Sequence, residues 1–421
     1  MIAFILFGSL AFCLIIGVPV ALALGVSSLL ALHYLEVPLS VVPQRIFVAL
    51  DAAAIMAVPC FILAGNLMTS GGISRRLVEF VNSMIGRVRG GMTYVMVLAC
   101  AFFAAMSGSA PATVIAIGGT VYPEMVKLGY PKERCAGLLA VAGGMGPIIP
   151  PSIIMVVYAT LTGCSIADLF SAGLVAGVMI SIMLVAICGY FARKENWPVS
   201  KERKTFRQTL IAFRGALTPL MLPVIILGGI YTGVVTPTEA AAVAVVYAFI
   251  VGVFIYREIP LRDIPKIVLD SAKSTAMVLF IIATSSSFSW LFAYSGISRQ
   301  VIDAIVALNL SPMLFNLIFA LLLLVFGTFM EGIAICVLFV PVLWPIADSL
   351  AIDNVQFGMV VSLAIMIGMM TPPVAVNLYA ASSVTQLKMG AIAKGEMPYL
   401  IGFASVMFIF TLFPWFSTFF R

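Results

Sequence analysis

Two short stretches of this chain decide its fold: GPIIPP at Gly146–Pro151 and GMMTPP at Gly368–Pro373. Each lies inside a long apolar run, and the two are 222 residues apart (368 less 146). Paired prolines remove backbone N–H donors and leave carbonyl groups without helical partners, so each apolar helix is interrupted there. Interruptions at matching places indicate a duplicated chain whose halves bring irregular segments into the same region.

The duplication extends beyond the prolines. The segment GISRRLVE at Gly72–Glu79 matches GISRQVID at Gly296–Asp303 with an offset of 224, and Pro123 falls on Pro345 with an offset of 222. The change of two residues is an ordinary loop insertion. Each repeat is therefore predicted to contain the same three elements in the same order: a membrane span, a helical hairpin and a proline-broken span.

Composition places most of the chain in lipid. Of the 421 residues 62% are apolar and only 10% are charged, and the mean hydropathy is +1.17. Soluble proteins carry about 25% charged residues, so a soluble enzyme is excluded. The seven cysteines form no CxxC pair, the single His33 excludes an HExxH zinc site, and no P-loop motif is present for ATP hydrolysis.

Apolar stretches long enough to cross a bilayer, which takes about 20 residues, are numerous. The candidate spans are Ile2–Ala31, Ile46–Met68, Ala136–Thr160, Leu169–Phe191, Ala216–Tyr231, Ala240–Tyr256, Thr275–Tyr294, Phe357–Val384 and Pro398–Phe419. Two further stretches, 92–125 and 313–347, are broken near the middle by polar residues and glycine. Arms of about 15 residues reach only ~22 Å, short of the ~30 Å hydrocarbon core, so we expect re-entrant hairpins. Two short tilted spans in each stretch are the alternative.

The predicted fold is an all-α polytopic membrane protein with inverted repeats, two re-entrant hairpins and two proline-broken helices. The expected units are an N-terminal span over 1–45, a first repeat over 46–165 (hairpin 92–125, broken helix 136–160), linking and scaffold spans over 166–269 with a cytoplasmic loop at 192–214, a second repeat over 270–390 (hairpin 313–347, broken helix 357–384) and a C-terminal span over 391–421. Five crossings separate the starts of the two repeats, so the second is expected upside down.

Basic residues predict the orientation. If the nine spans cross and the hairpins do not, one side receives 20 of the 23 basic residues (23 less 3), and the other keeps Arg45, Arg299 and Arg421. Positive residues favour the cytoplasmic side. The N-terminus is therefore expected in the cytoplasm and the C-terminus outside it.

Polar groups at the hairpin tips and helix breaks indicate an ion site. Carbonyl groups freed at the breaks suit a hard cation such as Na⁺, and helix N-termini suit an anion. The first hairpin adds the hydroxyl groups of Ser107, Ser109 and Thr113 beside Gly108. A simpler interpretation of Thr113 is a bond back to a carbonyl one turn earlier.

An acidic residue stands at the corresponding place in the second hairpin. Glu331 is the repeat equivalent of Ser109 and lies deep in an apolar stretch, so it must be protonated, paired or facing a cavity. We interpret it as an ion ligand or a proton-linked group. Asn377, shortly after the second proline pair, is a candidate polar ligand. Glu239 has a simpler interpretation, because it lies where a span begins, with Thr238 as the expected cap.

These motifs together resemble the large membrane subunit of the TRAP (tripartite ATP-independent periplasmic) transporters, within the wider ion-transporter superfamily. The segments that carry the resemblance cover nearly the whole chain: Phe7–Ser27, Met106–Thr113, Gly146–Tyr158, Gly233–Ala242, Gly327–Pro345 and Gly368–Tyr379. The chain departs at Glu331, where an aspartate is often found in the family.

The resemblance implies Na⁺-coupled secondary uptake of an organic acid, such as a C4-dicarboxylate or sialic acid, by an elevator movement across the bacterial inner membrane. It also implies a separate small four-helix membrane subunit, a periplasmic substrate-binding protein, and no cofactor besides the coupling ion. A stand-alone dicarboxylate symporter is the alternative within the superfamily, and a channel or membrane enzyme is the alternative outside it.

The resemblance also maps the expected site residues. The first Na⁺ site falls on Ser107, Gly108, Ser109, Gly146 and Pro150, and the second on Gly327, Thr328, Met330, Glu331, Gly368 and Thr371. The candidates for substrate contact are Thr113, Pro151, Pro373 and Asn377.

Overall fold

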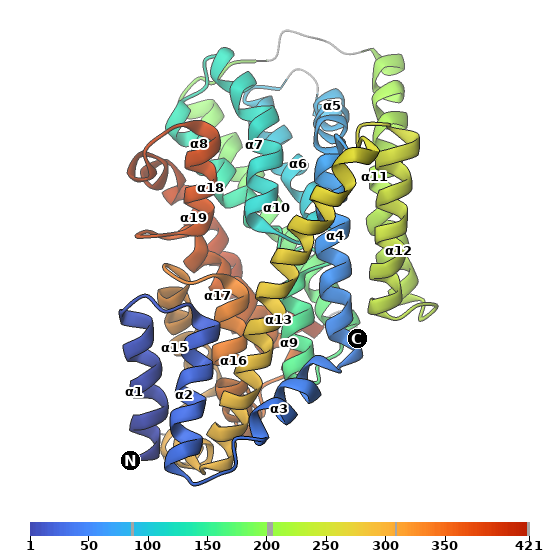
Figure 1. Ribbon diagram of the computed structural model, residues 1–421. Helices are drawn as coiled ribbons and strands as arrows, with labels where there is room; N and C mark the ends of the chain where they lie inside the picture. Colours follow the sequence, from blue (N-terminus) through green and yellow to red (C-terminus); the bar gives the residue numbers. More distant parts are fainter. Residues whose placement is uncertain (86–87, 200–204, 308–309, 419–421) are drawn as a thin grey trace.

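The structure is a computed structural model that describes residues 1–85, 88–199, 205–307 and 310–418 (Figure 1). These residues fold into helices, and no strand is named among them. Seven of the described helical stretches are long and apolar enough to cross a membrane: Ala53–Ser70, Ile166–Lys194, Phe206–Tyr231, Pro237–Ile255, Leu261–Tyr294, Gly332–Ser349 and Met389–Leu412. The predicted all-α, multi-pass membrane class is confirmed.

The two repeats contain matching elements. The first runs through α4 (Ala57–Ser70), α5 (Ile73–Ile85), α6 (Gly91–Ser107), α7 (Ala110–Lys127), α8 (Lys132–Gly143) and α9 (Ile153–Thr162). The second runs through α13 (Ile264–Tyr294), α14 (Ile297–Ala307), α15 (Pro312–Gly327), α16 (Gly332–Ser349), α17 (Asn354–Met370) and α18 (Val376–Thr385). In Figure 1, α6 and α7 lie in the upper half and α15 and α16 in the lower half, so the two hairpins occupy opposite ends.

The N-terminal region differs from the prediction of one span over Ile2–Ala31. It forms two helices packed against each other, α1 (Ile2–Ile15) and α2 (Val20–Tyr34), followed by α3 (Val41–Leu50) and η1 (Ala53–Met56). The chain reverses at Gly17, which has a φ of +83°, and Pro19 precedes α2 without an N–H to continue a helix. A single crossing is therefore replaced by a helical pair.

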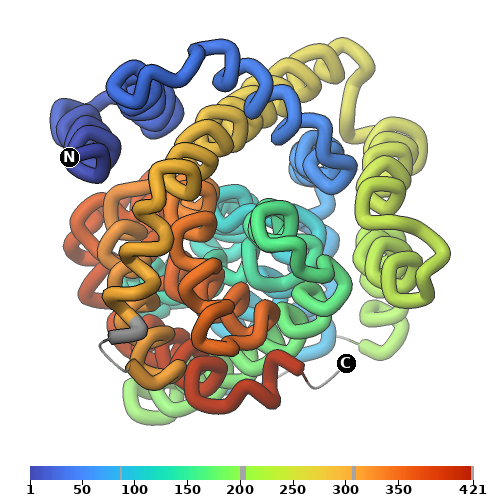
Figure 2. Tube along the Cα trace, turned by 90° about the horizontal axis from the view of Figure 1, so that it is seen from below, coloured from blue at the N-terminus to red at the C-terminus, as the bar shows by residue number. Residues whose placement is uncertain are grey.

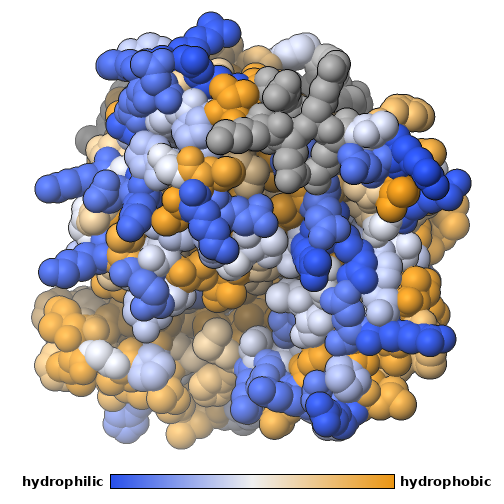
Figure 3. All heavy atoms as spheres, turned by 90° about the horizontal axis from the view of Figure 1, so that it is seen from above, coloured by the Kyte–Doolittle hydropathy of each residue, from blue (hydrophilic) through white to orange (hydrophobic). Residues whose placement is uncertain are grey.

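This difference changes the position of the N-terminus. Figure 1 places it at the lower end of the molecule, opposite the α7–α8 turn and the start of α11. Figure 3 views that opposite, upper end and shows hydrophilic side chains gathered on it. The expectation for the N-terminus counted Ile2–Ala31 as one crossing, whereas α1 and α2 form two helices. The C-terminal end of the described chain also lies in the lower half.

The linking helices are longer than predicted. They are α10 (Ile166–Lys194), α11 (Phe206–Tyr231), α12 (Pro237–Phe249), the π-helical η2 (Ile250–Ile255) and the short η3 (Leu261–Asp263). Helices α10 and α11 both extend into the stretch 192–214 that was predicted as a cytoplasmic loop. The chain ends with α19 (Met389–Leu412), which begins earlier than the predicted span Pro398–Phe419, and α20 (Trp415–Thr418).

The broken helices occupy the centre of the molecule. Figure 2 shows the N-terminal helices and the α11–α12 pair at the rim, with α8, α9, α17 and α18 gathered in the middle. Every residue of α17 from Val355 to Met370 is buried, as is α8 from Cys135 to Gly143. A helix that is apolar all round needs such a central position.

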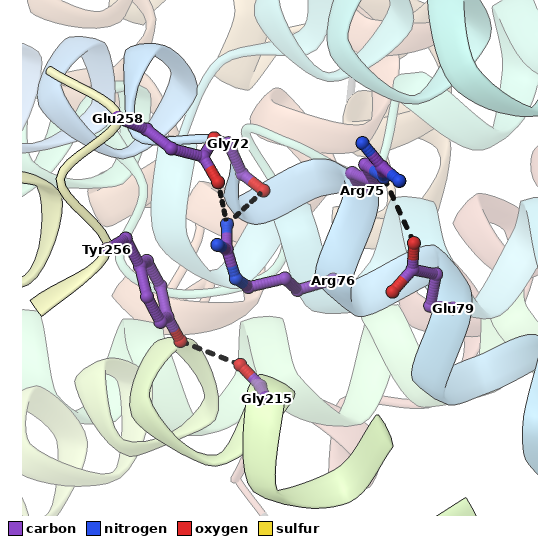
Figure 4. Close-up of polar contacts among 7 residues, drawn as sticks. All are labelled: Gly72, Arg75, Arg76, Glu79, Gly215, Tyr256 and Glu258. Atoms are coloured by element: carbon purple, nitrogen blue, oxygen red, sulfur yellow. Dashed lines mark hydrogen bonds and ion pairs between the residues drawn. The ribbon is translucent and has the colours of Figure 1, made fainter. Parts of the chain in front are cut away.

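A polar joint holds α5 to the linking helices (Figure 4). The guanidinium group of Arg76 makes an ion pair with Glu258 and lies 3.8 Å from the centroid of the Tyr256 ring. The hydroxyl group of Tyr256 donates to the Gly215 carbonyl of α11 at 2.7 Å. The repeat equivalent of Arg76 is Gln300 on α14, which has no cationic group. The two repeats are therefore joined to their surroundings differently.

Candidate functional site

The tip of the first hairpin gathers three oxygen atoms. Helix α6 ends at Ser107, and Gly108 reverses the chain with a φ of +58° before α7 begins. The Ser107 Oγ atom lies 3.0 Å from Thr113 Oγ1, which donates to the Ser109 carbonyl oxygen at 2.8 Å. Thr113 thus makes the expected bond to a carbonyl one turn earlier and also contacts the Ser107 hydroxyl group.

The first helix break is fully buried and internally bonded. Between the end of α8 and the start of α9, every residue of the stretch 144–152 is buried. The Ser152 hydroxyl group donates to the Pro147 carbonyl at 2.5 Å and accepts from the Met155 N–H at 3.3 Å. The Pro150–Pro151 peptide bond is cis. Ser152 therefore satisfies one carbonyl group freed by the break and caps α9.

This tip and this break touch through their backbones. A Cβ atom on Gly146 would lie 2.6 Å from the Ser109 carbonyl oxygen, and one on Gly108 would lie 2.7 Å from the Pro151 carbonyl oxygen. Only glycine leaves room at such contacts. The residues of the first predicted Na⁺ site therefore lie close together in the structure. Pro150 lies in the adjoining turn, and Pro151 is among the contacting residues.

The tip of the second hairpin uses a carboxyl group instead of hydroxyl groups. Glu331 is the N-cap of α16, and its Oε2 atom accepts from the N–H groups of Ile333 at 3.0 Å and Ala334 at 3.3 Å. The carboxyl group is thus paired with a helix N-terminus, which favours negative charge. Met330 beside it is buried, with 6% of its surface exposed.

The second break is held to its tip by backbone hydrogen bonds. The Thr328 carbonyl oxygen accepts from the N–H groups of Val374 at 3.1 Å and Ala375 at 3.0 Å. A Cβ atom on Gly327 would lie 2.7 Å from the Cα atom of Gly368. The second predicted set is therefore also brought together around this contact.

The two sites differ in their chemistry. The Thr371 hydroxyl group donates to the Ile367 carbonyl at 2.7 Å, so it is not directed at the tip. Pro372 and Pro373 are exposed, whereas their equivalents in the first break are buried. Phe329 stands where the first tip has Ser107. The first site is consequently buried and rich in hydroxyl and carbonyl oxygens, and the second is more open.

The sites adjoin each other in one cluster. A Cβ atom on Gly144 would lie 2.7 Å from Met370 Sδ at the end of α17, and one on Gly332 would lie 2.8 Å from Ile154 Cδ1 on α9. Asn377 is buried beside α8, where its Nδ2 atom donates to the Ala140 carbonyl at 3.4 Å. Its Oδ1 atom is buried without a hydrogen-bond partner among the described residues.

Sequence reasoning missed two residues that shape the first site. Ser152 follows the proline pair directly and precedes an apolar helix, which is the position of an N-cap, so a signal was present. Gly65 on α4 packs on the tip, because a Cβ atom there would lie 3.1 Å from the Ser107 carbonyl oxygen. No local pattern marks Gly65, since its role depends on a contact between helices.

Comparison with known proteins finds the same family that the sequence motifs resemble. Residues 7–416 match the family described as "Tripartite ATP-independent periplasmic transporter, DctM component". The chain is 40% identical to a C4-dicarboxylate TRAP transporter large permease protein of Rhodobacter capsulatus, covering 98% of this chain and 97% of that protein. It is 34% identical to a sialic acid TRAP transporter permease protein of Haemophilus influenzae, covering 96% of this chain and 66% of the other.

Two further matches bear on fold and assembly. An isethionate TRAP transporter permease protein named DctMQ, from Oleidesulfovibrio alaskensis, is 37% identical and aligns with 99% of this chain and 66% of its own length. The crystal structure of the Alcanivorax borkumensis YdaH transporter superposes with a TM-score of 0.64 at 15% identity, over 92% of this chain and 90% of that chain. This last likeness concerns the fold alone.

Proposed function

Because the chain belongs to the DctM component family of tripartite ATP-independent periplasmic transporters, we propose that it is the membrane permease of a Na⁺-driven uptake system. The cargo is a small organic acid of the kind named for its relatives, which are a C4-dicarboxylate, sialic acid and isethionate. The protein is a transporter subunit and not an enzyme.

The observation that carries the Na⁺ proposal is the contact between the first tip and the first break. The Ser109 carbonyl, the Ser107 and Thr113 hydroxyl groups and the backbone around Gly146 present neutral oxygen atoms in a buried place. Hard cations prefer such ligands, and irregular backbone at membrane depth is tolerated where it lines a site. The second site would add the carbonyl groups around Gly368 and the carboxyl group of Glu331.

The arrangement of the repeats supports a proposal about movement. We assign the two hairpins and the broken helices, α6–α9 and α15–α18, to a transport domain that moves as an elevator against the rim helices. Both hairpins would then be re-entrant, entering from opposite sides. If the hydrophilic end in Figure 3 is cytoplasmic, as the positive-inside rule requires, both termini are periplasmic.

Two partners complete the proposal. A small membrane subunit and a periplasmic binding protein would serve this chain, as the description of its family as tripartite indicates. The DctMQ relative is longer than this chain, which covers 66% of it. We expect the small subunit to contain four helices.

Reconstitution tests the function. Proteoliposomes containing the chain, its small subunit and its binding protein are expected to accumulate the acid only under an inward Na⁺ gradient. Omission of the binding protein or the small subunit should abolish uptake. Full uptake by the chain alone would instead identify a stand-alone symporter, and uptake without any Na⁺ gradient would identify a channel.

A pair of variants tests the site. Ser107→Ala removes one hydroxyl oxygen, and the loss of a ligand that contributes about 1–3 kcal/mol corresponds to a rise of roughly 5- to 150-fold in the half-saturating Na⁺ concentration. Thr120→Ala is the matched control, because Thr120 on α7 donates to the Ala116 carbonyl away from the tip. Equal Na⁺ dependence in both variants would contradict the assignment.

A further inference from the structure

Glu396 on α19 is buried without a partner. None of its surface is exposed to solvent (0%), and neither carboxyl oxygen has a hydrogen-bond partner among the described residues. Among those residues it is the only acidic one classed as fully buried. By contrast, Glu331 caps a helix and Glu195 pairs with Arg134 at 2.9 Å. A buried group of this kind is not explained by the packing of an apolar helix.

The burial results from a close crossing of α8 and α19. A Cβ atom on Gly137 would overlap the backbone nitrogen of Glu396, and one on Gly395 would overlap the Glu133 carbonyl oxygen. The two helix backbones therefore touch at this level. A carboxylate held here would lose its hydration without gaining a cation or an N–H group, which is strongly unfavourable. The neutral, protonated acid is the form that fits this packing.

A polar cavity lies next to the crossing, with a volume of about 690 Å³. Its lining includes Glu133, Arg134, Glu195, Lys388, Lys394 and Gly395. Gly395, which immediately precedes Glu396, lines this cavity and packs on the Glu133 backbone of α8, so the α8–α19 contact borders the cavity. The cavity belongs to the hydrophilic end of the molecule, where α8 begins.

Several other titratable groups lie on α19 and on the helices packed against it. They are Lys132, Glu133, Arg134 and Cys135 from α8, Asp168, Cys188, Tyr190, Arg193 and Lys194 from α10, Tyr379 from α18, and Lys394 and Tyr399 from α19 itself. Helices α15 and α17 carry none. Arg134 is held by Glu195 and lies 4.0 Å from the centroid of the Phe191 ring. Within the described part of the chain, no Lys or Arg side chain hydrogen-bonds to the Glu396 carboxyl group.

We propose that Glu396 is a proton-binding site of this protein, occupied when α8 and α19 are in contact and emptied into the neighbouring cavity when they separate. The proton passes from the carboxyl group to water in the cavity, and the carboxylate left behind faces the cations there. Helix α8 runs from this crossing to the first helix break, which begins after Gly143, and its Ala140 carbonyl accepts from Asn377 on α18, after the second break. The inference rests on the proposed function only because the separation of α8 and α19 needs the movement expected of a transporter.

Thermal unfolding in lipid nanodiscs tests the site without any transport assay. A proton held in the folded state but not in the unfolded state makes stability fall as pH rises. The unfolding midpoint of the unchanged protein should therefore fall from mildly acidic to alkaline pH relative to Glu396→Gln, which cannot titrate. Glu133→Gln, an exposed residue of the same cavity, is the matched control and should follow the unchanged protein.

The outcomes are distinct from those of the uptake experiments. A midpoint gap that widens with pH between the unchanged protein and Glu396→Gln supports the proton site, whatever ion drives uptake. Parallel midpoint curves would overturn it. If Glu396→Gln does not fold, Glu396→Met provides the same comparison. The infrared difference spectrum between the unchanged protein and the Glu396 variant should also show a protonated carboxyl band at neutral pH, and a difference spectrum without that band would overturn the assignment.

Discussion

At the scale of single residues, contact between backbones explains the site better than any side chain does. Gly146 and Gly368 occupy equivalent places in the two repeats, and each lies against a hairpin tip. At Gly368 a Cβ atom would lie 2.5 Å from the Leu324 carbonyl oxygen. Gly146 lies in the first break and Gly368 in the last turn of α17, and each lets the backbone of its broken helix approach a tip.

Gly146→Ala tests this account. The added methyl group would push the break away from Ser109, and such overpacking costs about 1–3 kcal/mol of stability. We expect a lower unfolding midpoint and loss of uptake. Gly119→Ala on α7 is the control, because a Cβ atom there has nothing within 4 Å. Full uptake by Gly146→Ala would show that the tip and the break need not touch.

Several of these residues could be predicted from the sequence because their chemistry is local. Proline pairs interrupt helices wherever they occur, so the breaks at 150–151 and 372–373 were predicted correctly. The predicted cap of α12, Thr238, was wrong, because the N-cap lies two residues earlier, at Thr236, which forms a capping box with Glu239. The Thr238 hydroxyl group instead donates to the Ala53 carbonyl of another helix. Glu396 was missed because the charges before Pro398 resembled a loop, although α19 already begins at Met389.

At the scale of elements, the repeats share their order but not their attachments. Helices α5 and α14 both begin after a glycine with positive φ, Gly72 and Gly296. Only α5 is fixed by the Arg76 joint with Glu258 and Tyr256. A joint that combines an ion pair with a ring contact holds α5 against the linking helices, and the equivalent Gln300 cannot form it.

Arg76→Ala is expected to destabilise the protein by about 1 kcal/mol, since the cation–π contact and the partly exposed ion pair are both lost. Arg75→Ala is a matched control, because Arg75 pairs with Glu79 on the exposed face of the same helix. Exposed pairs contribute little, so its unfolding midpoint should stay close to that of the unchanged protein. Equal shifts in both variants would show that the joint adds nothing beyond a surface pair.

Prediction of the elements failed where hydropathy was uniform. The stretch Ile2–Ala31 carries no charged residue to mark an end, and Gly17 and Pro19 lie inside it. The structure shows a reversal there, because the two helices bury apolar surface against each other. Helical periodicity cannot reveal such a turn when both faces are apolar.

At the scale of the whole molecule, the α1–α2 pair sets the end of the molecule at which the N-terminus lies. Protein tags fused to the N-terminus and to the C-terminus should both be removed by a protease added outside spheroplasts, since both ends lie away from the hydrophilic end in Figure 3. A tag inserted after Gly129, in the α7–α8 turn, should resist. Protection of the N-terminal tag alone would restore the single-span prediction.

The central claim is that Na⁺ bound at the hairpin tips drives uptake. The most direct measurement follows isotopic Na⁺ and the organic acid in the same proteoliposomes, reconstituted with both partners. We expect Na⁺ to enter only when the acid is present, and both fluxes to fall together in Ser107→Ala while they remain unchanged in Thr120→Ala. Uptake of the acid at full rate when choline replaces all the Na⁺ would contradict the account.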